Sequence, residues 1–352
     1  MYGHTFPFLR EYIYLFHISV FLMASGFCWK DNVICDFKSY KKYILKKLRS
    51  LYIPYVMCNG IFILLRNFFI RLNIYSDNKA FLILTEGAPY PQQLISKLSG
   101  VEIIKEEIKV VFGIGTTQLG SATWFLIALI IVLFIHGSIS YLFRRKRQYL
   151  DLLNVSLFII MAVISLFVNN TEVRGEIRRM PCTYMAFLLG IFVKKIIDQL
   201  SKWWMIVCAI LALAIMPRFG TIEMSAAHIQ NPVFFVVASI AGWILLWNIS
   251  YWGIKNCNVL KKVIEYIGKK TMPILCMHLL AFKISSLLYI VVTHKSKILL
   301  ASFHIIFETS EMYKLIYTLL GVLVPLMVCY MWNWLKMNIN TVVKHKVSVS
   351  NN

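Results

Sequence analysis

The fold is decided by an apolar run near the start of the chain, Phe16-His17-Ile18-Ser19-Val20-Phe21-Leu22-Met23-Ala24-Ser25-Gly26-Phe27. It contains one histidine, His17, among residues that otherwise suit a helix in lipid. A second histidine, His4, precedes the run, and the basic run Lys46-Lys47-Leu48-Arg49 lies at the mouth of the next apolar stretch. Ionisable side chains near lipid are costly, so these residues are the first candidates for function.

The composition indicates a helical membrane protein. Of the 352 residues, 59% are hydrophobic and 15% are charged, which is too apolar for an ordinary water-soluble surface. Most apolar runs are continuous over about 17–22 residues, enough for a helix to cross a ~30 Å hydrocarbon core, and they lack the alternation of barrel strands. We predict an all-α polytopic protein with a single membrane domain over residues 1–352. Nine spans are expected, at residues 12–29, 51–70, 123–141, 152–168, 181–193, 203–217, 232–250, 272–292 and 315–335.

The charges of the connecting segments predict the orientation. A basic set holds 22 Lys and Arg against 5 acids, and it comprises residues 30–50, 142–151, 194–202, 251–270 and 336–352. The alternate set holds 14 against 11, and it comprises residues 1–11, 66–122, 169–180, 217–231 and 293–314. Basic segments favour the cytoplasmic side, so the tail 336–352 is expected inside. The net charge of +21 is thereby explained without nucleic-acid binding, because the basic residues lie in short loops.

The same count bears on the start of the chain. Nine spans with a cytoplasmic C-terminus would place Met1 outside, which is unusual without an upstream signal. The sequence Met1-Tyr2-Gly3-His4-Thr5 is typical of the last turn of a helix. We therefore expect one further helix upstream of Met1, which would give ten spans with both ends inside.

Five short motifs occur in order along the chain. They are Gly3-His4-Thr5, the run 16–27, Lys46-Lys47-Leu48-Arg49-Ser50-Leu51-Tyr52-Ile53-Pro54-Tyr55, Trp124-Phe125-Leu126 and Ile267-Gly268-Lys269-Lys270-Thr271-Met272-Pro273-Ile274-Leu275-Cys276-Met277-His278. This ordered series resembles the acyltransferase-3 family, and within it the fucose 4-O-acetylase-like branch, from Gly3 to about Phe282. The chain departs from the family at Ile18-Ser19-Val20, where Met-Pro-Leu is usual. A first-helix arginine of the family would lie upstream of Met1.

The resemblance implies roles for four residues. His4 would be the general base that takes the proton from a sugar hydroxyl attacking a thioester carbonyl, since imidazole titrates near neutral pH. A loop histidine at an ordinary helix end is the alternative. His17 would contact the substrate from the same cavity, although a buried structural histidine is the alternative. Lys46 and Arg49, three residues apart on one helical face, would hold the phosphates of acyl-CoA, which arginine grips bidentately. A plain basic flank of a membrane span is their alternative. Pro54 would loosen the helix beside them.

Five further residues are candidates for a substrate cavity. Trp124 begins its span, where an interfacial aromatic anchor is the ordinary interpretation. Arg178 and Arg179 close a charged segment that is expected to lie outside, where it would bind the polar rim of a sugar; a solvated loop is the ordinary interpretation. His278 lies six residues into its span and is as well explained as a core histidine. Lys283 lies near mid-membrane and must face a partner or a water-filled cavity.

The resulting hypothesis is a plasma-membrane O-acyltransferase. It would move an acyl group, most simply acetyl, from acyl-CoA to a hydroxyl of a cell-surface or lipid-linked polysaccharide, with no bound cofactor and with membrane lipids around it. The main alternative is a transporter or flippase for a polar or lipid-linked solute, which often shows an internal repeat that we do not find here. A structural subunit of a glycan-export complex is a third interpretation. The eight scattered cysteines read as small buried hydrophobes, and no metal-binding signature occurs.

Overall fold

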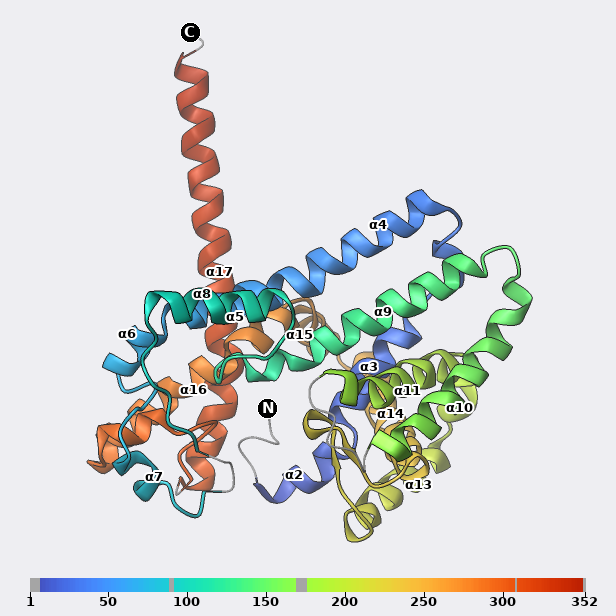
Figure 1. Cartoon of the computed structure of the whole chain (residues 1–352), viewed down its shortest axis with the longest axis horizontal. Helices are drawn as coiled ribbons and strands as arrows, with labels where there is room; N and C mark the ends of the chain where they lie inside the picture. Colours follow the sequence, from blue (N-terminus) through green and yellow to red (C-terminus); the bar gives the residue numbers. More distant parts are fainter. Residues whose placement is uncertain (1–6, 89–91, 169–175, 308, 351–352) are drawn as a thin grey trace.

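The structure is a computed structural model, and it describes residues 7–88, 92–168, 176–307 and 309–350. Nearly all regular structure in these residues is helical (Figure 1). The short strands β1 (Ile222–Glu223) and β2 (His228–Ile229) pair in an antiparallel manner. The α-helices are α2 (Pro7–Tyr14), α3 (His17–Phe27), α4 (Phe37–Lys47), α5 (Ile53–Leu64), α6 (Arg66–Arg71), α7 (Ala80–Leu84), α8 (Gly100–Val111), α9 (Trp124–Leu142), α10 (Leu150–Val168), α11 (Glu176–Lys195), α12 (Ile197–Leu200), α13 (Trp203–Ile215), α14 (Pro232–Asn256), α15 (Asn258–Lys269), α16 (Thr271–Thr293) and α17 (Glu311–Ser350).

Within the described residues, 5 helices are long and apolar enough to cross a membrane. They are Ser121–Leu142, Arg147–Val168, Pro232–Gly253, Thr271–Thr293 and Met312–Asn338, and each coincides with a predicted span. The prediction of a helical membrane protein is therefore confirmed, whereas the count of nine spans stays a prediction. The other four predicted spans are also helical. The stretch 181–193 lies within the continuous helix α11, 203–217 contains the shorter helix α13, and the remaining two are interrupted. The stretch 12–29 breaks between α2 and α3, and 51–70 divides into α5 and α6.

The core is built around two helices that meet at glycines. A Cβ on Gly26 of α3 or on Gly190 of α11 would lie 1.9 Å from a backbone carbonyl oxygen of the other helix, so only glycine allows this approach. Further along both helices, Lys194 Nζ donates to the Trp29 carbonyl oxygen at 2.7 Å, which shows that α3 and α11 run parallel. The small residues Ala24-Ser25-Gly26 of the apolar run thus include the glycine that allows this close packing. Helices α9, α10, α13 and α14 surround this pair (Figure 1).

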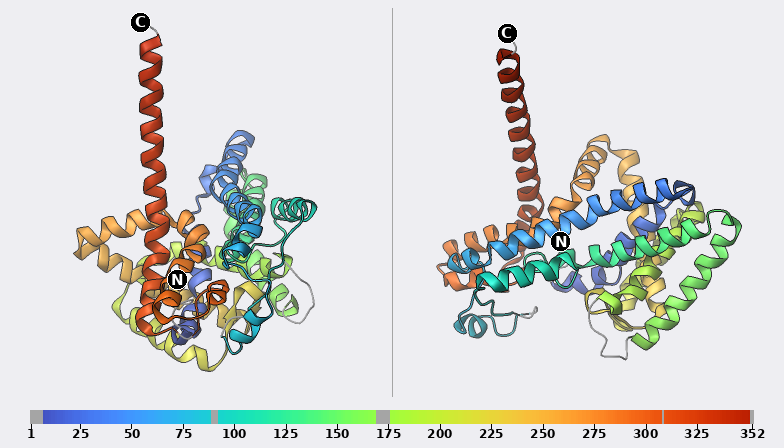
Figure 2. Two further views of the ribbon diagram at one scale, coloured as in Figure 1. Left: turned by 90° about the vertical axis from the view of Figure 1, so that its left-hand side faces the viewer. Right: turned by 45° about the horizontal axis from the view of Figure 1, so that its top comes forward.

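Helices α4 and α5 form one long helix with a π-helical segment, Leu48–Tyr52, between them. The Ile53 N–H donates to the Leu48 carbonyl oxygen, five residues back. Pro54 follows and carries no N–H, so the ordinary helical bond to Ser50 cannot form there. Such π segments are frequent at functional sites. The long helix lies beside α9, as both views of Figure 2 show, and Tyr40 stacks on Tyr141 at 5.3 Å between ring centroids.

Residues beyond α6 fold back over one face of α5. Asn59, fully buried in α5, uses its whole amide on this segment and its own helix: Nδ2 donates to Thr123 Oγ1 at 2.9 Å and to the Tyr55 carbonyl oxygen at 3.1 Å. Its Oδ1 accepts from the backbone N–H and the hydroxyl of Thr117 at 2.9 and 3.0 Å. Tyr52 and Tyr55 donate to the carbonyl oxygens of Val111 and Gly115. Within this segment, Gly100–Val111 forms the helix α8, which packs on α5.

The connecting segments contact members of their own charge set. In the less basic set, Arg179 Nε donates to the Ser225 carbonyl oxygen, and the Phe303 N–H donates to Gln92 Oε1, both at 2.7 Å.

In the basic set, Arg147 Nη2 donates to the Ile34 carbonyl oxygen at 3.4 Å, and Lys195 pairs with Asp151. These four contacts therefore join segments within the basic set or within the less basic set. Which of the two sets faces the cytoplasm stays a prediction. The C-terminal part of α17, which carries the predicted tail, extends away from the other helices (Figures 1 and 2).

Candidate functional site

His17 begins α3 and has the hydrogen bonding of a base. The chain turns between α2 and α3, so the histidine lies at a helix start and not within one continuous span over residues 12–29, which the sequence predicts. Its Nδ1 lies 3.0 Å from the Ile13 carbonyl oxygen, which can only accept, so Nδ1 carries the proton. Nε2 therefore presents a lone pair, and it makes no hydrogen bond to the described residues. His4, the other predicted catalytic histidine, lies outside the described residues.

Trp124 and Arg179 come together at the start of α9. The guanidinium lies 4.8 Å from the centroid of the Trp124 ring, and its Nε donates to the Ser225 carbonyl oxygen at 2.7 Å. The contact between Phe125 and Phe21, 4.9 Å between centroids, joins this region to α3 one helical turn beyond His17. Arg178 beside it has a buried Nε without a hydrogen-bond partner in the described residues. The predicted candidates Trp124, Arg178 and Arg179 thus share the end of the protein at which His17 begins its helix.

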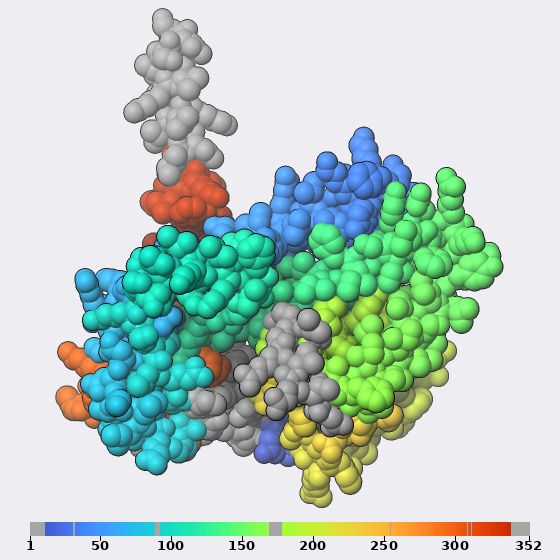
Figure 3. All heavy atoms as spheres, viewed as in Figure 1, coloured from blue at the N-terminus to red at the C-terminus, as the bar shows by residue number. Residues whose placement is uncertain are grey.

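Lys46 and Arg49 lie in an open groove of about 610 Å³ on α4 and the π-helical segment, hereafter the basic groove. Every residue of the groove is exposed, and α4 lies at the surface (Figure 3). Lys47 points elsewhere, since its ammonium lies 5.6 Å from the Tyr43 ring centroid and burial lowers its pKa. The groove is lined by Lys38, Lys41, Lys42, Leu45, Lys46, Arg49 and Ser50.

Three lysines of the basic groove were not predicted as site residues, although the sequence holds their signal. Lys38, Lys41 and Lys42 precede Lys46 and Arg49 at spacings of three and four, which is one face of a helix. Five cations on one exposed face, next to the π-helical segment, have the charge and the hydrogen-bond donors to hold a polyanion such as a chain of phosphates.

His278 and Lys283 of α16 are held by backbone atoms. His278 is buried, and its Nδ1 lies 3.1 and 3.0 Å from the carbonyl oxygens of Ile274 and Leu275. The Lys283 ammonium is buried and donates to the carbonyl oxygens of Leu300 and Ser302 at 2.9 and 2.8 Å. The partner predicted for this mid-membrane lysine is thus the end of the 3₁₀ turn Lys297–Ala301. Neither residue lines the basic groove or the cavity described next.

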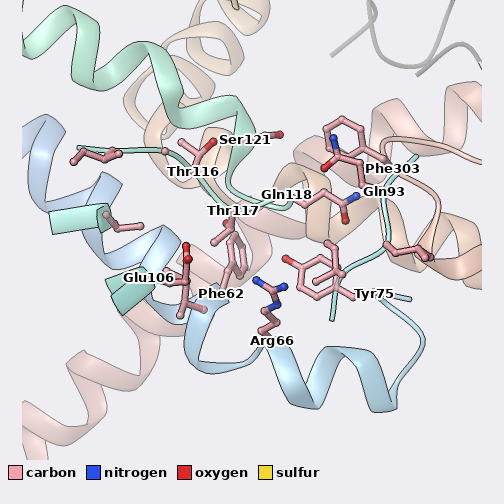
Figure 4. Close-up of a pocket in the computed structure, with 16 residues that line it drawn as sticks. Phe62, Arg66, Tyr75, Gln93, Glu106, Thr116, Thr117, Gln118, Ser121 and Phe303 are labelled. Atoms are coloured by element: carbon pink, nitrogen blue, oxygen red, sulfur yellow. The ribbon is translucent and has the colours of Figure 1, made fainter. Parts of the chain in front are cut away.

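A polar cavity of about 500 Å³ lies between α5, α6, α8 and the segments around residues 93 and 117, and Phe303 closes one side (Figure 4). None of its residues was predicted as a site residue, because they come from separate loops that only the fold brings together. Ser121 lines the cavity, whereas Trp124, three residues on, contacts Arg179. The short turn Ser121–Thr123 therefore joins the polar cavity to the contact between Trp124 and Arg179. Its polar lining includes Arg66, Tyr75, Gln93, Glu106, Thr117 and Gln118.

His136 of α9 was also missed, although a histidine inside an apolar helix is the same kind of signal as His17. It is buried, and its ring lies 4.7 Å from Trp29 and 4.9 Å from Phe187 between centroids. Its Nδ1 lies 3.2 Å from the Tyr184 hydroxyl. An aromatic cage with one hydrogen bond fits a structural core histidine.

One comparison with known proteins relates the chain to a family. The family model for the acyltransferase domain of the acyltransferase-3 family matches residues 1–330. No curated protein and no solved structure matches the chain significantly. The matched range contains every candidate residue described above.

Proposed function

Because the chain belongs to the acyltransferase-3 family of membrane acyltransferases, we propose that it is an O-acetyltransferase of the plasma membrane. It would transfer acetyl from acetyl-CoA to a hydroxyl of a cell-surface or lipid-linked polysaccharide. The observation that carries the proposal is the basic groove, in which Lys46 and Arg49 lie with three further lysines. The fucose 4-O-acetylase-like branch is the proposed subtype.

The donor would bind from the cytoplasmic side, where the loop charges place α4. Coenzyme A carries several phosphate charges, and arginine and lysine groups on one face can hold them by charge-assisted hydrogen bonds. The proposed arrangement keeps the phosphates at Arg49 and extends the thioester arm through part of the ~30 Å core towards His17. The π-helical segment beside Arg49 is where the helix surface departs from regular packing, which suits an entry point.

The proposed chemistry is acyl transfer with general-base catalysis. His4 or His17 takes the proton of the acceptor hydroxyl while its oxygen forms a bond to the thioester carbonyl carbon. The carbon–sulfur bond then breaks, and the imidazolium returns the proton to the departing thiolate of CoA. His17 is prepared for this role, because Nδ1–H is bound to Ile13 and Nε2 is an acceptor. His4 has the same role by resemblance to the family.

Arg49→Ala tests the donor site. Phosphate contacts are equal in ground and transition states, so the substitution should raise KM for acetyl-CoA about 10–100-fold with little change in kcat. Arg49→Lys should recover only part, because lysine does not grip bidentately. Arg145→Ala removes the same charge from the basic set outside the groove and should leave KM unchanged. An unchanged KM for Arg49→Ala would remove the groove from donor binding.

Two histidine substitutions test the base. His4→Ala should lower kcat about 10²–10⁴-fold while leaving the KM for acetyl-CoA nearly unchanged. His17→Asn keeps a donor close to the position of Nδ1 but has nothing in place of Nε2. If His17 were only structural, His17→Asn would retain activity, whereas a base or a substrate contact predicts loss despite a normal melting temperature. The readout is the O-acetyl content of the glycan by NMR, together with turnover of purified enzyme.

A further inference from the structure

The polar cavity contains an arginine whose hydrogen-bonding capacity is largely unused. Arg66 Nε donates to the Ser96 carbonyl oxygen at 2.9 Å, which fixes the guanidinium at the start of α6. Its two terminal nitrogens face the cavity (Figure 4) and make no hydrogen bond to the described residues. A guanidinium held by one edge with its other donors free is prepared for bidentate binding of a phosphate or carboxylate.

The other walls of the cavity suit a sugar. The side chains of Gln93 and Gln118 line it without a hydrogen bond to the described residues, and Glu106 supplies acceptors near Arg66 (Figure 4). Phe62 and Phe303 provide apolar surface beside these groups. Hydroxyl groups need both donors and acceptors; the two amides provide both, and the Glu106 carboxylate, which also accepts from Lys109 at 2.7 Å, provides acceptors. The cavity therefore fits a hydroxylated ring that carries one anionic group.

One rim of the cavity is apolar and exposed. Ile114 lines the cavity with 65% of its surface exposed, and the neighbouring Phe112 is 75% exposed. The same surface continues along α8 through Ile104 and Ile108, which are 61% and 50% exposed, whereas the opposite face of α8 packs on α5. An amphipathic helix with such a face lies in the headgroup layer of a bilayer. The segment that carries α7 and α8 covers the left of the face in Figure 3.

We infer that the polar cavity binds the headgroup of a lipid-linked acceptor, a sugar joined to its lipid through phosphate. Arg66 holds the phosphate, Gln93, Gln118 and Glu106 contact the sugar, and the lipid chain leaves over Phe112 and Ile114 into the membrane. This inference rests on the proposed function, because it selects lipid-linked sugars over finished polysaccharide as the acceptor. The turn Ser121–Thr123 would place the bound sugar next to the region of His17.

The test measures binding by the purified full chain in detergent. The probes are synthetic farnesyl phosphoglucose, glucose 1-phosphate and farnesyl phosphate. We expect farnesyl phosphoglucose to bind at least about tenfold tighter than either partial probe, since it uses the polar lining and the apolar rim together. Arg66→Gln should weaken its binding about 10–100-fold. Arg71→Gln, an exposed arginine of the same helix that does not line the cavity, is the matched control and should have no effect.

Two further variants guard against loss of folding. Gln93→Ala and Gln118→Ala should weaken the binding of farnesyl phosphoglucose and leave the binding of farnesyl phosphate unchanged. All variants should bind acetyl-CoA with normal affinity. Equal affinity for glucose 1-phosphate and its lipid ester would show a site for a free sugar phosphate and overturn the inference, as would normal binding by Arg66→Gln. If the protein bound farnesyl phosphoglucose but transferred no acetyl group to it, the proposed function would be refuted while the inferred binding site would stand. If Arg66→Gln transferred acetyl with an unchanged KM for the acceptor, the inferred binding site would be refuted while the proposed function would stand.

Discussion

Gly190→Ala should weaken the contact between α3 and α11 on which the bundle depends. The added Cβ would lie 1.9 Å from the Met23 carbonyl oxygen and 2.8 Å from the Phe27 nitrogen. Both atoms belong to a helix backbone, which cannot rotate away as a side chain can. The helices would have to separate by about 1 Å, and a gap of that size forfeits a quarter to a half of each dispersion contact across the interface.

The magnitude follows from two opposing effects. Overpacking of this kind costs about 1–3 kcal/mol and occasionally more, and the value should be near the upper end because backbone meets backbone. Replacing a helical glycine by alanine returns about 1 kcal/mol through helix propensity. The net expectation is a destabilisation of about 2 kcal/mol. Since α3 carries His17 and α11 carries Arg179, acyl transfer should fall in parallel.

The assay is thermal unfolding of the detergent-solubilised protein, followed by fluorescence-detected size exclusion. Gly268→Ala is the matched control, because its Cβ in α15 would meet nothing within 4 Å. That variant should be neutral or slightly stabilised, through the helix propensity of alanine alone. If Gly190→Ala had the same melting temperature as Gly268→Ala and not a lower one, the close approach of α3 and α11 would be contradicted.

Three further predictions concern the segments around the polar cavity and the outer loops. Asn59→Leu should destabilise the protein by about 1–3 kcal/mol, since it removes the acceptor of the half-buried Thr117 N–H and the donor to the buried Thr123 hydroxyl. Limited proteolysis within 111–123 should accelerate, and unchanged cleavage would contradict this anchor. Lys283→Met removes two charge-assisted hydrogen bonds but also a buried charge, so a net loss of stability of about 1–3 kcal/mol is expected. It should appear as faster proteolytic cleavage within 294–310. A stabilised variant would show that the cost of desolvating the ammonium outweighs the hydrogen bonds. Burial raises the pKa of Glu107 above its unfolded value, so the folded state binds this proton more readily than the unfolded state. Stability should therefore fall as pH rises from the unfolded pKa through the folded pKa. Glu107→Gln should remove this dependence of the melting temperature on pH, and a dependence that persisted would exclude Glu107 as its source.

Hydrophobic content and run length were enough to predict a helical membrane protein, because a continuous apolar run has few alternatives to a spanning helix. The pairing of Lys46 with Arg49 also followed from helical spacing alone, and both lie in the basic groove. Local pattern was less informative where a span contains a break. The turn before His17 and the division of 51–70 into α5 and α6 depend on packing against other helices, which hydropathy does not register.

What the sequence determined by itself was therefore the class of fold, the family and the basic face of α4, since each depends on residues close together along the chain. The polar cavity depends on the tertiary structure: Arg66, Glu106, Gln118 and Phe303 are remote in sequence and meet only because the segment after α6 folds back onto α5. Lys283 shows the same limit. Its charge near mid-membrane predicted a partner. That partner is a pair of backbone carbonyls in a turn seventeen and nineteen residues away, and the packing of the turn on α16 decides which carbonyls they are.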